Sequence, residues 1–299
     1  MSATAAGFRS GYVAIVGRPN VGKSTLLNRL VGTKISIVSP RPQTTRHRVR
    51  GILTTEHAQL VFVDTPGFQT LHGGALNRAL NRSVIQTLED VDVTLMVVEA
   101  LRFNAGDRQV VGLLKRDRPA ILAINKVDLV KDKGLLLPFI QQAADTYPFA
   151  EIVPVSAERG VGLEDLVATI GRYLPEGPPL YDPEEMTDAS ERFLAAELLR
   201  EKLFRLLGEE LPYATTVVVE EFKDEEALKR IHAVIYVEKD SQKAIVIGRK
   251  GEKLKEIASQ ARLDMERLFG TKVFLDVWVK VRRGWSDDER MLKSLGFES

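Results

Sequence analysis

At residues 17–24 the chain contains Gly-Arg-Pro-Asn-Val-Gly-Lys-Ser, which fits the pattern G-x-x-x-x-G-K-[ST] at every fixed position. An apolar run at 12–16 precedes it, and apolar residues at helical spacing follow it within 22–31. A strand, a glycine-rich loop and a helix in this order are the setting in which the pattern binds phosphate. Backbone N–H groups of such a loop surround a polyphosphate, and the helix start adds the positive end of its dipole. The stretch therefore predicts a phosphate-binding loop within an α/β sheet.

Two side chains of this loop have predicted roles of their own. Lys23 is a point charge for the β- and γ-phosphates of a nucleotide, and the Ser24 hydroxyl is a suitable ligand for Mg²⁺. The loop residues expected to bind the nucleotide are Asn20, Val21, Gly22, Lys23, Ser24 and Thr25.

A second loop is expected to meet the same phosphates. Asp64-Thr65-Pro66-Gly67 follows the apolar run 60–63, which is typical of a buried strand. An aspartate at such a strand end can hold Mg²⁺ through water, and we expect this of Asp64. The backbone N–H of Gly67 is expected to reach the γ-phosphate.

A third loop predicts that the base is guanine. Asn125-Lys126-Val127-Asp128 follows the apolar run 120–124. A carboxylate at Asp128 can accept hydrogen bonds from guanine N1–H and the 2-amino group. Adenine offers neither donor, and leaving the carboxylate unpaired costs about 1–3 kcal/mol.

Other residues around the base have supporting roles. Asn125 is expected to tie neighbouring loops together, and the stem of Lys126 can cover the base. Ser156 and Ala157 follow the apolar run 152–155, and their loop is expected to offer a backbone N–H to guanine O6.

The order of patterns predicts two domains. Strands and helices alternate to about residue 174, which indicates a mostly parallel α/β sheet with helices on both faces. The loops above all follow strands, at the carboxyl edge where such sheets bind ligands. Prolines and glycine then interrupt the pattern. We expect the first domain at 1–176, a linker at 177–188 and a second domain at 189–299.

The second domain contains a basic loop. Residues 248–251 are Gly-Arg-Lys-Gly, between two expected helices in an α-β-β-α-α-β order. Residues 241–283 hold 11 basic and 5 acidic residues, whereas 181–240 hold 8 and 16. This segregation favours a local polyanion site, although a solvated helix face would have the same charge pattern. The residues expected to bind RNA are Ile247, Gly248, Arg249, Lys250 and Gly251.

Together these motifs resemble the translation-factor-related GTPases and, within them, the bacterial Era-type GTPases. The second domain resembles a KH domain of the bacterial type, and the resemblance covers nearly all 299 residues. It implies a GTP/GDP switch with Mg²⁺ that binds single-stranded RNA, with the 3′ end of small-subunit ribosomal RNA as the target during 30S assembly. The alternative is a related GTPase that acts at the membrane or in tRNA modification.

The family pattern also assigns catalytic roles. We expect Lys23, Thr45 and Gly67 to act in hydrolysis, with Thr45 as a second hydroxyl ligand of Mg²⁺ and Thr44 as the fallback. Phe68 stands where many small GTPases have a water-orienting glutamine, so slow hydrolysis in isolation is expected, and the adjacent Gln69 is a poor replacement. Asn20 matches a pattern that in related GTPases coordinates K⁺.

Composition limits the remaining choices. The chain has no cysteine, which excludes disulfides and thiolate metal sites, and no apolar run approaches the roughly 18 residues of a membrane span. We expect a cytoplasmic monomer that contacts the small ribosomal subunit and not DNA, with peripheral membrane association left open. A pure RNA-binding module is opposed by the intact Lys23 and Asp64, and a P-loop ATPase by Asp128.

Three aromatic residues of the second domain carry weaker expectations. Phe274 and Trp278 alternate with valines in the last expected strand, and we expect them to pack under the helices. Trp285 follows the strand, and the sequence leaves open whether it docks the tail or stacks on a base.

Overall fold

The computed structural model describes the chain except for residues 1–6, 40, 42–43, 69–73, 209–210 and 296–299. By their contacts the residues divide into two compact units. The first comprises 1–36, 45–73 and 80–188, and the second comprises 37–44, 74–79 and 189–299. Two short segments of the amino-terminal half thus belong to the second unit.

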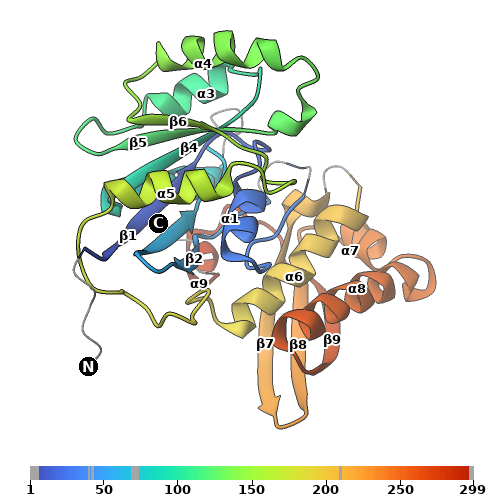
Figure 1. Ribbon diagram of the computed structural model, residues 1–299. Coiled ribbons are helices and arrows are strands. Elements are labelled where there is room, and N and C mark those ends of the chain that lie inside the picture. Colours follow the sequence, from blue (N-terminus) through green and yellow to red (C-terminus); the bar gives the residue numbers. More distant parts are fainter. Residues whose placement is uncertain (1–6, 40, 42–43, 69–73, 209–210, 296–299) are drawn as a thin grey trace. The chain divides into compact units, whose positions relative to one another are not determined.

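The described part of the first unit contains one six-stranded sheet (Figure 1). Its strands are β1 (Arg9–Val16), β2 (Val49–Thr54), β3 (Ala58–Asp64), β4 (Val93–Glu99), β5 (Ala120–Asn125) and β6 (Glu151–Pro154). The spatial order is β2-β3-β1-β4-β5-β6, and every neighbouring pair is parallel except β2 with β3. The carboxyl ends of β1, β3, β4 and β5 therefore lie along one edge, which confirms the predicted α/β class.

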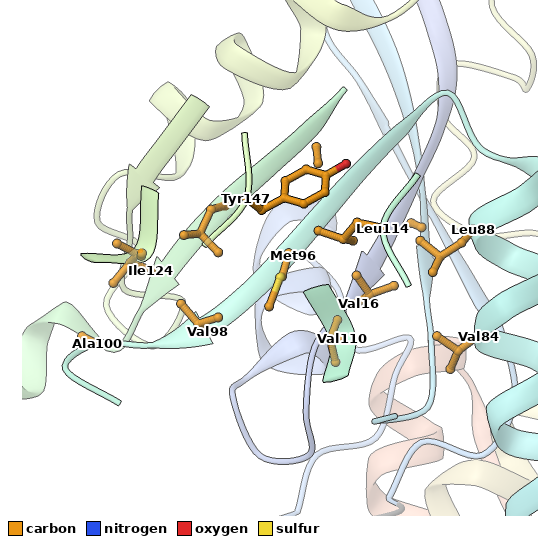
Figure 2. Close-up of a cluster of buried hydrophobic side chains, with 14 of the residues drawn as sticks. Val16, Val84, Leu88, Met96, Val98, Ala100, Val110, Leu114, Ile124 and Tyr147 are labelled. Atoms are coloured by element: carbon orange, nitrogen blue, oxygen red, sulfur yellow. The ribbon is translucent and has the colours of Figure 1, made fainter. Parts of the chain in front are cut away.

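Helices cover both faces of this sheet. They are α1 (Lys23–Val31), α2 (Ala75–Asp90), α3 (Ala105–Val111), α4 (Leu136–Ala144) and α5 (Leu163–Tyr173). Alternate strand residues, such as Met96 and Ile124, form a buried cluster with Val84 of α2 and Val110 of α3 (Figure 2). On the other face, α1 contacts β2 and β3, and α5 contacts β1, β3 and β6 (Figure 1). Burial on both faces explains why the central strands are almost continuously apolar.

Residues 177–188, expected as a linker, have contacts that place them in the first unit. The backbone N–H of Gly177 donates to Phe8 O, and that of Ile52 donates to Met186 O, at 3.1 and 2.9 Å. The proline-rich stretch is thus bonded to the strands of the sheet, and the expected domain boundaries stay a prediction.

The second unit has a three-stranded sheet and helices in the predicted order. Its elements are α6 (Glu191–Leu206), β7 (Thr215–Glu225), β8 (Leu228–Val237), α7 (Asp240–Ile247), α8 (Glu252–Phe269), β9 (Lys272–Val281) and α9 (Glu289–Ser294). β7 and β8 are antiparallel, whereas β8 and β9 are parallel. Ile257, Ala261 and Met265 of α8 pack with Ile231 and Ile235 of β8 in a separate core.

The aromatic residues of β9 correct one expectation. Phe274 and Trp278 are 46% and 61% exposed, so the prediction that they pack under the helices is wrong. They lie on the sheet face that the helices leave uncovered, opposite the buried Val273 and Val279. Trp285 is fully buried, and its Nε1 donates to Ala214 O at 3.1 Å, so it docks the tail.

Candidate functional site

Oxygen atoms from the first turn of α1, from the segment before β2 and from the end of β3 meet at the phosphate-binding loop. Ser24 Oγ lies 2.8 Å from Thr45 Oγ1 and 2.7 Å from Asp64 Oδ2. Asp64 is fully buried, and its Oδ1 has no hydrogen-bond partner among the described residues. Mg²⁺ prefers oxygen donors in an octahedron with bonds of 2.0–2.1 Å, which puts adjacent ligands about 2.9 Å apart. The two hydroxyls are therefore spaced as direct ligands of this ion would be, and the neighbouring carboxylate can accept a hydrogen bond from one of its waters.

The surroundings of the buried Asp64 carboxyl group shift its pKa. Burial raises its pKa above the ordinary value, and the charge of Lys23 with the hydroxyls of Ser24 and Ser36 opposes the rise. Ser36 Oγ donates to Asp64 Oδ2 at 2.8 Å. A divalent ion would favour the ionised form further.

The two threonines considered for the metal point to different partners. Thr45 Oγ1 lies 3.5 Å from Asp64 Oδ2, in addition to its contact with Ser24. Thr44 Oγ1 donates to Arg41 O at 2.7 Å. The geometry thus brings Thr45, and not Thr44, to Ser24 and Asp64.

Lys23 is buried at the start of α1. Its Nζ donates to the carbonyl oxygens of Gly17 and Arg18 at 2.9 and 3.0 Å. Burial lowers the pKa of this ammonium to about 8, although the charge of Asp64 acts in the opposite direction. The ammonium is therefore held inside the loop that is expected to surround the phosphates.

Gly67 lies against the phosphate-binding loop. A Cβ at this position would be 2.8 Å from Pro19 N, closer than real Cβ atoms approach. Phe68, the next residue, packs against the core of the first unit and brings no hydrogen-bonding group. Gln69 lies outside the described residues.

Residues 125–128, expected to bind guanine and called the guanine loop below, are bonded to neighbouring segments through Asn125. Its Nδ2 donates to Val21 O at 2.8 Å, and its Oδ1 accepts the N–H groups of Lys126 and Ala157 at 2.8 and 2.9 Å. Ser156 Oγ donates to Asp128 Oδ1 at 2.6 Å, which orients the carboxylate. In this arrangement the Ala157 N–H bonds Asn125, where the sequence predicted an N–H for guanine O6.

Sequence reasoning missed three carboxyl or hydroxyl groups of this region: Ser36, Glu99 and Asp107. Glu99 is the last residue of β4, so it occupies the same sheet edge as Asp64 and Asn125. Its place at the carboxyl end of an apolar run could have marked it as a candidate from the sequence alone. Asp107 lies in α3, and its contact with Arg18 spans 89 residues, so no local pattern indicates it.

The basic loop of the second unit joins α7 to α8. Gly248 has φ 72° and ψ 180°, and a Cβ there would lie 2.5 Å from Lys253 Cβ, so only glycine fits. Arg249 and Lys250 are exposed, and neither forms an ion pair with another described residue. Ile247 is half-buried beside the core. The loop therefore offers two cations and a close backbone approach to a polyanion.

Comparison with known proteins agrees with both sites. Residues 12–126 match the family of 50S ribosome-binding GTPases, and residues 210–286 match the KH domain family. Fold and site thus define a P-loop GTPase joined to a KH domain. GTPase Era of Nitrosomonas eutropha is 58% identical over 99% of this chain and all of its own length. That of Chromobacterium violaceum is 57% identical over 97% of this chain and 98% of its own. The chain belongs to the GTPase Era family.

Two solved structures resemble the whole chain. A variant of Aquifex aeolicus Era bound to GDP·AlF4⁻ has a TM-score of 0.93 at 40% identity and covers 98% of this chain and all of its own. An Era structure with MgGDPNP and nucleotides 1506–1542 of 16S ribosomal RNA has a TM-score of 0.94 at 40% identity, with the same coverage.

Proposed function

We propose that this chain is a GTP-hydrolysing switch that binds single-stranded RNA at the 3′ end of small-subunit ribosomal RNA during 30S assembly. One observation carries the proposal: the oxygen cluster of Ser24, Thr45 and Asp64 and a basic GxxG loop occur in the same chain. A 40%-identical Era structure that holds MgGDPNP and 16S RNA supports the target. The relatives' names favour this over a role in tRNA modification or at the membrane.

The proposed residue roles follow from the geometry. Ser24 and Thr45 would bind Mg²⁺ directly and Asp64 through water, while Lys23 contacts the β- and γ-phosphates. When bound, Mg²⁺ neutralises charge that develops on the phosphates. The Gly67 N–H would contact the γ-phosphate. The remaining proposed GTP contacts are Asn20, Val21, Gly22, Thr25, Asn125, Lys126, Asp128, Ser156 and Ala157.

We propose that hydrolysis is slow without an activator and depends on K⁺. Phe68 cannot orient water, because its side chain has no hydrogen-bonding group; its ring is partly buried against the core. Asn20, exposed at the loop tip, is the proposed K⁺ ligand. Turnover measured in KCl should exceed turnover in NaCl at equal ionic strength, and the Asn20→Ala variant should lose the difference. Equal rates in the two salts would remove this role.

The RNA site is tested by reversing the charge of its loop. Arg249→Glu with Lys250→Glu should lower affinity for a 16S 3′-end oligonucleotide at least tenfold, because two phosphate contacts become repulsive. Affinity for Mg·GTP should stay within twofold. Lys115→Glu with Arg116→Glu is the matched control, since this adjacent exposed pair lies in the first unit. An unchanged RNA affinity in the loop variant would contradict the site.

The target itself needs a separate measurement. Ultraviolet crosslinking in cells, followed by sequencing of the attached RNA, should recover the 3′ end of small-subunit ribosomal RNA. Recovery of tRNA instead would favour the alternative function. None of the helices in the described part of the chain is long and apolar enough to cross a membrane. The monomeric state, the cytoplasmic location and a peripheral membrane contact stay predictions.

A further inference from the structure

We infer that Glu99 is a positioning residue that fixes the phosphate-binding loop and the guanine loop relative to each other. The inference rests on the proposed nucleotide site. Glu99 ends β4 between the strands that lead into the two loops, and its side chain is 14% exposed. Its Oε2 lies 3.1 Å from Lys126 Nζ and 3.3 Å from Arg18 Nη2. One carboxylate oxygen thus joins a cation from each loop.

The contact with Lys126 holds two strained residues. Lys126 Nζ also donates to Asn20 O at 2.8 Å, so the ammonium bridges the guanine loop and the phosphate-binding loop. Asn20 and Lys126 both have left-handed backbones, with φ of 66° and 65°. This backbone conformation is disfavoured for residues other than glycine, more for lysine than for asparagine, and it persists only where the surroundings hold it. The negative charge of Glu99 keeps the bridging ammonium in place.

The contact with Arg18 extends the same network to α3. Arg18 Nε donates to Asp107 Oδ2 at 3.1 Å, and this carboxylate also accepts the N–H of Asn104 at 2.9 Å. Asp107 is fully buried, and the Arg18 side chain is 16% exposed. Charge-assisted bonds from one guanidinium to two carboxylates have a defined geometry. Arg18, in the phosphate-binding loop, is therefore anchored to both β4 and α3.

These contacts bear on affinity because the two loops grip opposite ends of one nucleotide. The phosphates meet one loop and the base meets the other, so their spacing must match the ligand. If the spacing of the two loops is already fixed before the nucleotide binds, less free energy is spent on ordering the loops during binding. Neutralising Glu99 should remove one of the contacts that hold each cation and weaken Mg·GDP binding about tenfold, which corresponds to about 1.4 kcal/mol.

The test uses Glu99→Gln, which keeps the shape of the side chain and removes its charge. We expect titration calorimetry to show about tenfold weaker Mg·GDP binding and kcat at saturating GTP within threefold of the unchanged chain. Glu89→Gln is the control, because Glu89 is exposed in α2 and its pair with Lys115 spans 3.7 Å. Its affinity should equal that of the unchanged chain. If the Glu99→Gln variant binds Mg·GDP with an affinity within twofold of the unchanged chain, the inference is overturned.

A double-mutant cycle separates positioning from a general loss of stability. If Glu99 acts through Lys126, the effect of Glu99→Gln on Mg·GDP affinity should fall below threefold in a Lys126→Met background. An undiminished tenfold effect there would overturn the inference. If Glu99→Gln does not fold, Glu99→Asp, which keeps the charge but shortens its reach, enters the same cycle. Absence of Mg·GDP binding by the unchanged chain would instead overturn the proposed function.

Discussion

At the scale of single residues, the buried ammonium of Lys23 makes nucleotide affinity depend on pH. Its pKa of about 8 in the free protein lies below the ordinary 10.5. A bound polyphosphate favours the charged form and raises this pKa, so binding takes up a proton once the pH exceeds about 8. Affinity for Mg·GDP should therefore be nearly constant below that pH and fall about tenfold between pH 7 and 9.

Calorimetry in buffers of different ionisation enthalpy checks this directly. Proton uptake should be close to zero at pH 6.5 and approach one per nucleotide near pH 9, where guanine N1 still keeps most of its proton. A pH-independent affinity across this range would show that Lys23 stays charged in the free protein.

The residue scale also shows what the sequence could reveal. Ser24 and Asp64 were found because each belongs to a short motif with fixed spacing after a strand. The role of Glu99 was not predicted, because its partners Arg18 and Lys126 belong to two loops that are far apart in the sequence. Trp278 was misplaced because alternation in a strand identifies two faces, but not which of them the helices cover.

At the scale of elements, the two tryptophans of the chain form a natural comparison. Trp285→Ala should lower the free energy of unfolding by about 3–5 kcal/mol, because a fully buried ring is removed and a cavity remains. Trp278→Ala, 61% exposed on β9, should change it by about 0.5 kcal/mol or less. Urea unfolding of both variants measures the difference. Equal losses would contradict the docked position of the tail.

Most elements were predictable, and the deviations have local causes. α3 begins at Ala105, where the Asn104 side chain accepts a hydrogen bond from the N–H of Gly106, and it ends at Val111. β7 continues beyond the stretch 214–219 as far as Glu225. β8 begins at Leu228, before the stretch 231–237. Polar residues in the hairpin continue the ladder of backbone hydrogen bonds, which periodicity of apolar residues does not detect.

At the scale of the whole molecule, two separate buried clusters predict two unfolding events. One lies around the six-stranded sheet and the other beneath α6 and α8. Mg·GDP should raise the midpoint of one calorimetric transition, because it binds the native first unit and not the unfolded chain. Trp285→Ala should lower the other midpoint. A single transition that shifts as a whole in both experiments would show that the units unfold cooperatively.

The contact of Gly67 with Pro19 has a mechanical consequence. With no room for a methyl group between them, a side chain at position 67 would displace either this backbone, which we propose contacts the terminal phosphate, or the loop that we propose surrounds the other phosphates. Loss of the γ-phosphate from the proposed contact would therefore leave this backbone free to move away from the loop, but not toward it.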